Sequence, residues 1–255
     1  MFKLLTRKII ISRLHECFFY KKNSINLQLS NVLNQIQIVG PGSLSVIITS
    51  AFFIGLVFSL QIVKEFLYLN AISLVGSMLT ISFLRELSPV LTSVILIGKV
   101  GSYFTSELAT MKVTEQIDAL YILGISPINY LVIPRVIALI LMLPILNFFS
   151  FVTSLFSSAF ICFTLYNIDP RIFFKSVFYI LSIIDIMKSS LKTFIFGFFI
   201  ALISCIFGLT ARGGAKGVGT STTSSVVISL LSVFILDFIL SYYMFNKLDS
   251  SLKIL

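Results

Sequence analysis

The sequence predicts an all-α, polytopic membrane protein with about five transmembrane helices. Hydrophobic residues make up 57% of its 255 residues and charged residues only 11%, and the mean hydropathy is +1.05. A soluble domain carries more charge, typically about 25% of its residues. Several apolar runs approach the roughly 20 residues that a helix needs to cross a bilayer. We expect an N-terminal segment over residues 1–42 and one transmembrane domain over residues 43–255.

The N-terminal segment is predicted to contain an interfacial helix. Residues 2–22 (FKLLTRKIIISRLHECFFYKK) alternate charged and bulky side chains at helical spacing, which is typical of a helix lying on a membrane. Six of the 19 Lys and Arg residues precede the first apolar run, which favours a cytoplasmic location for this end. A signal peptide is the alternative, but its apolar core would be too short and no small-residue cleavage site follows.

The next two elements are defined by apolar runs and their breaks. Gly40, Pro41 and Gly42 interrupt the chain, and the first span is predicted over residues 43–63. Residues 71–108 contain Ser88 and Pro89, a pair typical of a helix start. This stretch is therefore either one long helix kinked at the proline or a short element followed by a true span, and the sequence leaves both open.

The second half of the chain predicts three further spans. Asp169 and Pro170 mark the start of a short amphipathic or interfacial helix, which we place at residues 171–185. Residues 127–135 are predicted as an interfacial lead-in to the span that follows them. The predicted spans cover residues 136–163, 193–211 and 226–245.

The densest polar cluster of the chain lies between two apolar runs, in residues 107–127 (ELATMKVTEQIDALYILGISP). Residues 112–123 contain neither Gly nor Pro and predict a helix of about three turns. Val113, Ile117 and Leu120 form one apolar stripe at i, i+4 and i+7. Gly124 is placed to cap this helix, and Ser126 and Pro127 are placed to begin the next one.

The charge of this short helix favours a protein partner. A helix that floats among lipid headgroups usually has a basic polar face, because membrane surfaces are anionic. Here the polar face carries Glu115 and Asp118, which suits docking into a groove on another protein. With a cytoplasmic N-terminus, this helix and the loop at residues 211–222 are expected on the cytoplasmic side.

Two blocks of the chain closely resemble a known family. Residues 85–136 contain T-E-Q-x-x-A-L, G-x-x-P and P-R at spacings that are characteristic of this family. Residues 213–245 resemble the C-terminal loop and the last helix of its members. The family is the Mla-type (MlaE) permeases, the membrane subunits of ABC transporters that move phospholipids between membranes in bacteria and plastids. The two blocks cover about a third of the chain, and the order of elements agrees over most of the rest.

The resemblance implies a function for the polar helix. Residues 111–123 would be the coupling helix, which seats in a groove of a separate ABC ATPase subunit. That subunit would bind ATP, and this chain would carry no cofactor. The residues expected to couple to the ATPase are Lys112, Glu115, Gln116, Asp118, Ala119, Leu120 and Gly124.

The resemblance also implies the assembly and its location. Two permeases would form a homodimer around a cavity for membrane lipids, and an MCE-type substrate-binding subunit would sit on the far side. The abundance of Phe, at 26 residues, together with Ile, Asn and Lys and no Trp, indicates an AT-rich genome. A plastid inner envelope is therefore expected, with a bacterial inner membrane as the alternative.

Five charged residues interrupt the apolar runs and are candidates for a lipid pathway. An ionised group at the bilayer centre costs roughly 2.5–3.5 kcal/mol unless it is paired or wetted. Internal pairing or contact with water is the other interpretation, and for the two cations contact with a lipid headgroup is equally open. At position 99 the family commonly carries Arg, so this Lys keeps the charge but loses a bidentate fork for phosphate. The five residues are Arg85, Glu86, Lys99, Glu107 and Asp237.

Other function classes fit the sequence less well. An ion-coupled secondary transporter could use Glu86, Glu107 and Asp237 as a relay, but no internal repeat is visible. A membrane scaffold without transport would not need charges inside its spans. The glycine-rich residues 213–219 are not a P-loop, because Lys216 is followed by Gly rather than by Ser or Thr.

Catalysis, metal binding and nucleic-acid binding are not expected either. The only histidine, His15, lies in the basic N-terminal segment, and the three cysteines are widely separated, so neither a catalytic set nor metal-ligand spacing is present. The net charge is +9, but the basic residues do not gather in one patch with exposed aromatic residues. We therefore expect a transport subunit that is not itself an enzyme.

Overall fold

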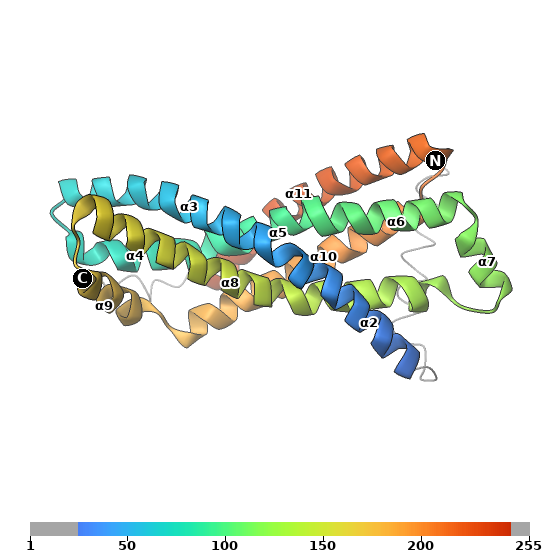
Figure 1. Cartoon of the computed structure of the whole chain (residues 1–255), viewed down its shortest axis with the longest axis horizontal. Helices are drawn as coiled ribbons and strands as arrows, with labels where there is room; N and C mark the ends of the chain where they lie inside the picture. The colour runs from blue at the N-terminus through green and yellow to red at the C-terminus, as the bar shows by residue number, and fades with distance from the viewer. Residues whose placement is uncertain (1–24, 246–255) are drawn as a thin grey trace. The chain divides into compact units, whose positions relative to one another are not determined.

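A computed structural model describes residues 25–245 of the chain (Figure 1). The described residues contain helices and no strand. Five helical stretches are long and apolar enough to cross a membrane, namely Leu29–Tyr68, Ile72–Val113, Ile128–Tyr166, Ile183–Leu209 and Gly214–Met244. The prediction of an all-α integral membrane protein is thus confirmed. The interfacial helix predicted at residues 2–22, with His15, lies outside the described residues.

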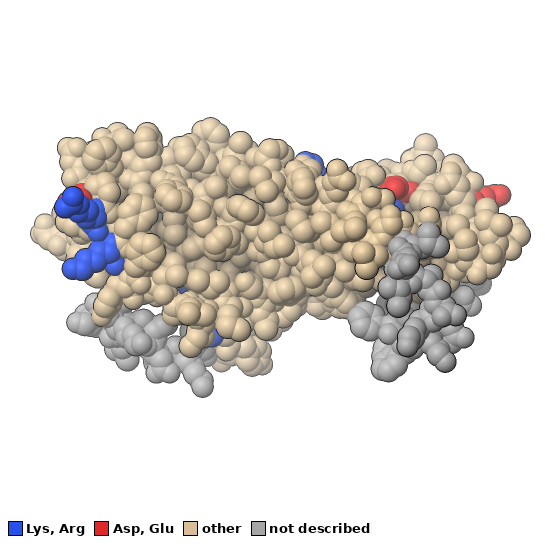
Figure 2. All heavy atoms as spheres, turned by 60° about the horizontal axis from the view of Figure 1, so that its bottom comes forward, with Lys and Arg blue, Asp and Glu red and all other residues tan. Residues whose placement is uncertain are grey.

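Much of the visible surface carries neither basic nor acidic side chains, as Figure 2 shows. Large apolar side chains are exposed along the long helices, for example Phe53, Phe156 and Phe238. Such a surface would aggregate in water, whereas hydrocarbon chains of lipids solvate it well. The exposure pattern therefore agrees with the membrane location.

The first span begins earlier than its apolar run suggests. Helix α2 covers Ile25–Val39, and helix α3 covers Pro41–Tyr68. The two helices are separated by Gly40 alone, whose N–H donates to the carbonyl of Ile36 at 2.8 Å. Pro41 occupies the first position of α3, where its missing N–H leaves no additional unpaired group. The predicted interruption at residues 40–42 is therefore a single turn residue.

The ambiguous stretch at residues 71–108 forms part of one unbroken helical run from Ile72 to Val113. Ser88 and Pro89 do not interrupt this run, because α5 continues directly from a wide π-helical turn that lies just before them. In that turn the N–H of Ser88 donates to the carbonyl of Phe83. The run consists of η1 (Ile72–Leu74), α4 (Val75–Ser82), η2 (Phe83–Leu87), α5 (Ser88–Leu96), η3 (Ile97–Gly101) and α6 (Ser102–Val113).

The remaining helical segments are α7 (Gln116–Ile122), η4 (Ile128–Val132), α8 (Ile133–Tyr166), α9 (Pro170–Ile180), α10 (Ile183–Leu209) and α11 (Gly214–Phe245). The three remaining spans, formed by α8, α10 and α11, begin earlier than predicted. Asp169 caps α9 by accepting a hydrogen bond from the Arg171 N–H at 2.8 Å, as the sequence predicted. The predicted end of this helix at residue 185 is wrong, because Leu181 is extended and Asp185 lies in the first turn of α10.

The described chain forms two compact units, each assembled from three separate segments. The α7 unit contains residues 25–43, 96–142 and 195–233. The α9 unit contains residues 44–95, 143–194 and 234–245. The long helices α3, α8, α10 and α11 each contribute residues to both units.

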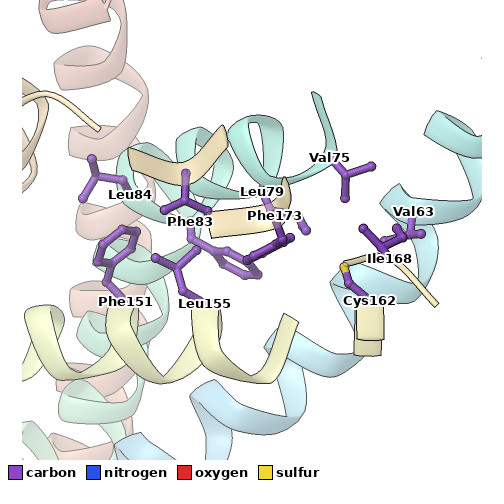
Figure 3. Packing of buried hydrophobic residues seen from close by; sticks show 11 residues of the cluster. Val63, Val75, Leu79, Phe83, Leu84, Phe151, Leu155, Cys162, Ile168 and Phe173 are labelled. Atoms are coloured by element: carbon purple, nitrogen blue, oxygen red, sulfur yellow. The ribbon is translucent and has the colours of Figure 1, made fainter. Parts of the chain in front are cut away.

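The α9 unit has an apolar core around Phe83, shown in Figure 3. Helix α9 covers α4 and inserts Phe173 and Val177 into this core. Close approach of the two helices requires a glycine, because a Cβ at Gly76 would lie 2.6 Å from the carbonyl oxygen of Phe173. Buried residues from four helical segments and from the loop before α9 complete the core, namely Val63, Val75, Leu79, Leu84, Phe151, Leu155, Cys162 and Ile168.

The α7 unit is also packed through small residues. A Cβ at Gly208 of α10 would lie 2.6 Å from the Leu108 Cβ and 3.1 Å from the Thr105 carbonyl. At the same crossing, the Thr105 hydroxyl makes hydrogen bonds to the Ser204 carbonyl at 3.1 Å and to the Ser225 hydroxyl at 2.9 Å. Small residues and hydroxyl contacts are the usual means by which membrane helices associate, because burial from water cannot drive it there.

Gly55→Ala is expected to destabilise the protein by about 1–3 kcal/mol. A Cβ at this position would lie 2.8 Å from the Ser154 carbonyl oxygen, so the backbones of α3 and α8 would have to separate. Thermal unfolding of the purified protein in detergent measures the effect. Gly219→Ala is the matched control, since a Cβ there meets nothing within 4 Å. Equal melting temperatures for the two variants would contradict this packing.

Candidate functional site

The polar segment that the sequence singled out is a separate short helix, α7, which follows α6 in Figure 1. The predicted continuous helix over residues 112–123 is wrong in its first part. Helix α6 ends at Val113, and the chain turns at Glu115, which adopts a left-handed φ of 61°. Positive φ is unusual for a residue with a Cβ, and it breaks the helical path. Lys112 and Glu115, which were predicted to couple to the ATPase, therefore precede α7.

An ion pair and one buried side chain fix the start of α7. Lys112 Nζ, at the end of α6, lies 2.8 Å and 3.1 Å from the two carboxylate oxygens of Asp118. Ile117 is buried and anchors the helix to the rest of the α7 unit. An exposed pair of this kind contributes about 0–1 kcal/mol, so its main effect is on the direction of the turn. Asp118, predicted to face a partner, thus makes its described contact within the chain.

The end of α7 is closed as the sequence predicted. Gly124 has φ of 73°, its N–H donates to the Tyr121 carbonyl at 3.1 Å, and the Ile125 N–H donates to the Leu120 carbonyl at 3.0 Å. This pair of bonds is the Schellman motif, which satisfies the last carbonyls of a helix. The next helix then begins at Pro127, whose predecessor Ser126 accepts from the Tyr130 N–H at 3.2 Å.

The surface of α7 combines polar and apolar exposed side chains. Ile122 is 87% exposed and Leu123 is 71% exposed, and both precede the cap at Gly124. Gln116 and Ala119 are exposed as well, whereas Leu120 is partly buried. Large apolar side chains that are this exposed outside a candidate span usually mark a protein contact.

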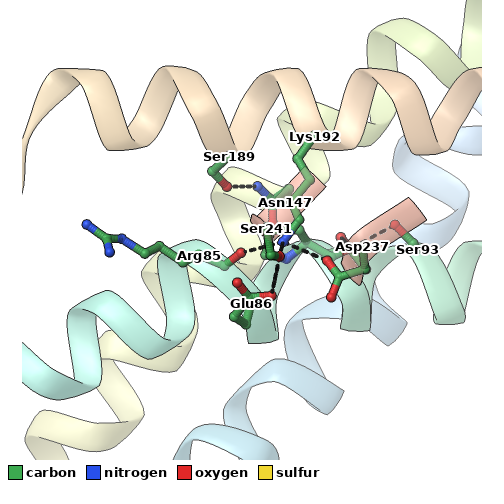
Figure 4. Close-up of polar contacts among 10 residues, drawn as sticks. Arg85, Glu86, Ser93, Asn147, Ser189, Lys192, Asp237 and Ser241 are labelled. Carbon is green, nitrogen blue, oxygen red and sulfur yellow. Dashed lines mark hydrogen bonds and ion pairs between the residues drawn. The ribbon is translucent and has the colours of Figure 1, made fainter. Parts of the chain in front are cut away.

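A buried lysine lies at the centre of a cluster of polar side chains in the α9 unit (Figure 4). Lys192 of α10 is 0% exposed. Its ammonium lies 2.6 Å from Asp237 Oδ1, 3.0 Å from Glu86 Oε2 and 2.8 Å from the Ser241 hydroxyl. Internal pairing, one of the interpretations that the sequence left open for Glu86 and Asp237, is what the structure shows. Two of the candidate lipid-pathway acids share one buried cation.

The same lysine compensates for the proline in the long helix. Pro89 has no N–H to donate to the carbonyl of Arg85, four residues earlier, and Lys192 Nζ donates to that carbonyl at 2.9 Å. A carbonyl freed by proline inside a membrane protein needs such a partner, because no water reaches it in the hydrocarbon region. The π-helical turn and the buried lysine together make Pro89 tolerable at this position.

Lys192 was missed by the sequence analysis. The predicted span began at residue 193, so the lysine was assigned to the region before the membrane. Helix α10 begins at Ile183 instead, which places Lys192 in the interior of the helix. A single cation directly before a long apolar run is the sequence feature that marks it.

The other charged candidates have separate partners. Arg85 Nη2 lies 3.3 Å from Asp185 Oδ1, and Asp185 also accepts from the Ser182 hydroxyl at 2.8 Å. In the α7 unit, Lys99 Nζ donates to the Gly42 carbonyl. Glu107 Oε2 lies 2.6 Å from Arg135 Nη2. Internal pairing therefore accounts for the position of most of these charges, and their contact with lipid stays a prediction.

Lys192→Met is expected to destabilise the protein by about 3–5 kcal/mol, because Glu86 and Asp237 would lose the cation they share. Thermal unfolding in detergent is the measurement. Lys175→Met, at an exposed position on α9, is the matched control and should change stability by at most about 0.5 kcal/mol. A melting temperature for Lys192→Met equal to that of the control would show that the cluster is not structural.

The chain matches the family described as Permease MlaE over residues 32–243. It is 53% identical over 229 residues to a probable ABC transporter permease protein of Pyropia yezoensis, covering 90% of this chain and 87% of that one. A probable ABC transporter permease protein of Synechocystis sp. is 48% identical over 216 residues, with coverage of 85% and 82%. The protein TRIGALACTOSYLDIACYLGLYCEROL 1, chloroplastic, of Arabidopsis thaliana is 45% identical over 223 residues, with coverage of 88% and 64%. The resemblance identified from the motifs is confirmed, and the chain belongs to the MlaE permease family.

Proposed function

We propose that this chain is the membrane-spanning permease subunit of an ABC transporter that moves phospholipids or related lipids between membranes. Its membership of the MlaE permease family and its five candidate spans support this assignment. Two of the relatives described above are named as probable permease proteins of ABC transporters. The ion-coupled alternative gains no support from these relatives.

The exposed surface of α7 is the observation that carries the proposal. The helix is held at its start by the Lys112–Asp118 pair and at its end by the Gly124 cap. Between these points it presents Tyr121, Ile122 and Leu123 to the outside. A short rigid helix with exposed apolar side chains loses little conformational entropy when it docks into a groove. We therefore infer that α7 is the coupling helix.

ATP is bound and hydrolysed by a separate ATPase subunit in this proposal, and the permease carries no cofactor. The glycine-rich residues 213–219 have a structural role instead. The Gly217 N–H donates to the Gly213 carbonyl at 3.3 Å, and a Cβ at Gly217 would collide with the Arg212 carbonyl at 1.8 Å. These glycines let the chain turn tightly into α11.

The complete transporter is proposed to contain two copies of this chain and an MCE-type substrate-binding subunit. Helix α11 is the least buried of the candidate spans and leaves a broad apolar face for lipid or a second copy. Exposed Lys99 is the cation best suited to meet a lipid headgroup, because its described contact is to a backbone carbonyl.

We place the protein in the plastid inner envelope, with a bacterial inner membrane as the alternative. The Arabidopsis relative is named as chloroplastic.

Ile122→Gln and Leu123→Gln should each reduce co-purification of the ATPase subunit at least about tenfold, because they replace apolar contact groups with amides. Pull-down from native membranes measures this. Ile72→Gln is the matched control, because Ile72 is an exposed isoleucine at the start of the second span. It should leave the ATPase bound.

Transport provides the second measurement for these variants. Proteoliposomes with fluorescent phospholipid, the ATPase and the substrate-binding subunit should move lipid only with ATP, and the α7 variants should lose this activity. Unchanged ATPase binding and transport in both α7 variants would rule out the coupling role. Lipid movement without ATP or partner subunits would rule out the ABC assignment itself.

A further inference from the structure

A small polar pocket of about 160 Å³ lies within the α7 unit. It is formed by α2, by the second half of α6, by η4 and by the first turn of α8. Its lining is unusually polar for a protein of this composition, and the polar lining residues are Asn31, Asn34, Gln35, Glu107, Tyr130 and Arg135. Neither the fold nor the coupling role of α7 requires such a pocket.

Arg135 lines this pocket, and two of its donor nitrogens have no partner among the described residues. Its side chain is 2% exposed, so water outside the protein does not reach it freely. Nη2 pairs with Glu107 at 2.6 Å, and the guanidinium lies 5.5 Å from the centre of the Phe104 ring. Within the described residues, Nε and Nη1 have no hydrogen-bond partner. Buried donors are nearly always satisfied, so an unseen group is expected to accept from them.

The pocket is also lined by an acceptor that needs a donor. Gln35 Oε1 is buried and has no hydrogen-bond partner in the described part of the chain. One class of group satisfies both needs, because a hydroxyl accepts from the arginine and donates to an amide oxygen. A phosphodiester or a carboxylate could accept from Arg135 but has no proton to donate to Gln35 at neutral pH.

Charge balance also favours a neutral occupant. Arg135 and Glu107 are the charged residues among those that line the pocket, and they compensate each other. A bound anion would lie close to the Glu107 carboxylate without a second cation, which is unfavourable where the dielectric constant is low. A hydroxyl-rich group adds no net charge. The pocket volume accommodates a group the size of glycerol or of one hexose.

We propose that this pocket binds a neutral, hydroxyl-rich group, either the glycerol or sugar part of a lipid headgroup or a free polyol. Gln35 and Arg135 would make the defining hydrogen bonds. This site goes beyond the proposed transport function, because it needs neither the ATPase nor lipid movement. Its failure would therefore leave the transport assignment untouched.

Lipid retention tests the proposal. The full-length chain is placed in nanodiscs that contain equal amounts of phosphatidylcholine and of a diacylglycerol with one neutral hexose, both with the same acyl chains. After extraction, native mass spectrometry counts the retained lipid. Wild-type protein should favour the hexose lipid about tenfold, and Gln35→Leu should reduce this preference about fivefold through the lost hydrogen bond. Gln37→Leu, an exposed position on the same helix, should keep it.

A competition experiment separates the two sources of the group. If free methyl hexoside displaces the lipid at millimolar concentration, the site recognises the polyol itself, and if it does not, the site recognises a headgroup held in the membrane. Both results support the proposal when Gln35→Leu weakens binding. No preference in the wild-type protein, or the same preference in Gln35→Leu, would overturn it. Stronger retention of phosphatidic acid than of the hexose lipid would overturn it too, because that result would identify an anion site.

Discussion

Inside a bilayer, each charge and each backbone polar group must find its partner within the protein, and in the α9 unit the ammonium of Lys192 is the partner of four polar or charged groups. It contacts two carboxylates, one hydroxyl and the carbonyl that Pro89 leaves free. Three helical segments, η2, α10 and α11, contribute to this cluster. The arrangement of these segments thus depends on a few directional bonds as well as on the packing of small and apolar side chains.

Arg135 offers an instructive contrast with Lys192. Both cations are almost completely buried, and each has a carboxylate partner within 3.0 Å. Lys192 has more acceptors around it than protons to donate, which is expected of a cation with a structural role. Arg135, which lines a pocket, has two nitrogens without a hydrogen-bond partner in the part of the chain that the structure describes. The degree of hydrogen-bond satisfaction, rather than burial or charge, distinguishes the two sites.

Local sequence signals predicted local structure well. Gly124 predicted a helix cap, and Asp169 with Pro170 predicted a helix start, because the chemistry of these positions acts within one helical turn. Apolar runs predicted the five spans, although their ends were set too narrowly. A run stops at the first charged residue in the sequence, whereas a helix continues when that residue is paired inside the protein, as α10 does through Lys192.

Features that depend on contacts between distant segments could not be read from the sequence. The pairing of Lys192 with Asp237 requires knowing which faces of α10 and α11 meet. The continuity of the second span required a π-helical turn before Pro89, which has no simple sequence signature. The positive φ of Glu115 is another case, because residue propensity alone predicts an uninterrupted helix there. The physical signals in the sequence predicted only that the short polar helix docks on a protein partner. The transport function came from the family resemblance.

The wide turn η3, at Ile97–Gly101, determines the direction in which the side chains at the end of the second span point. Related proteins could differ in this direction. Such a turn contains one residue more than an α-helical turn would, and one residue corresponds to a rotation of about 100° around the helix axis. A sequence that lost a single residue here could remain helical, yet every side chain after the turn would point in a new direction. Glu107 would then no longer face Arg135. In an alignment, a one-residue gap at this point would therefore indicate that the polar side chains inside the protein pair differently. This would hold even where the residues on both sides of the gap were identical.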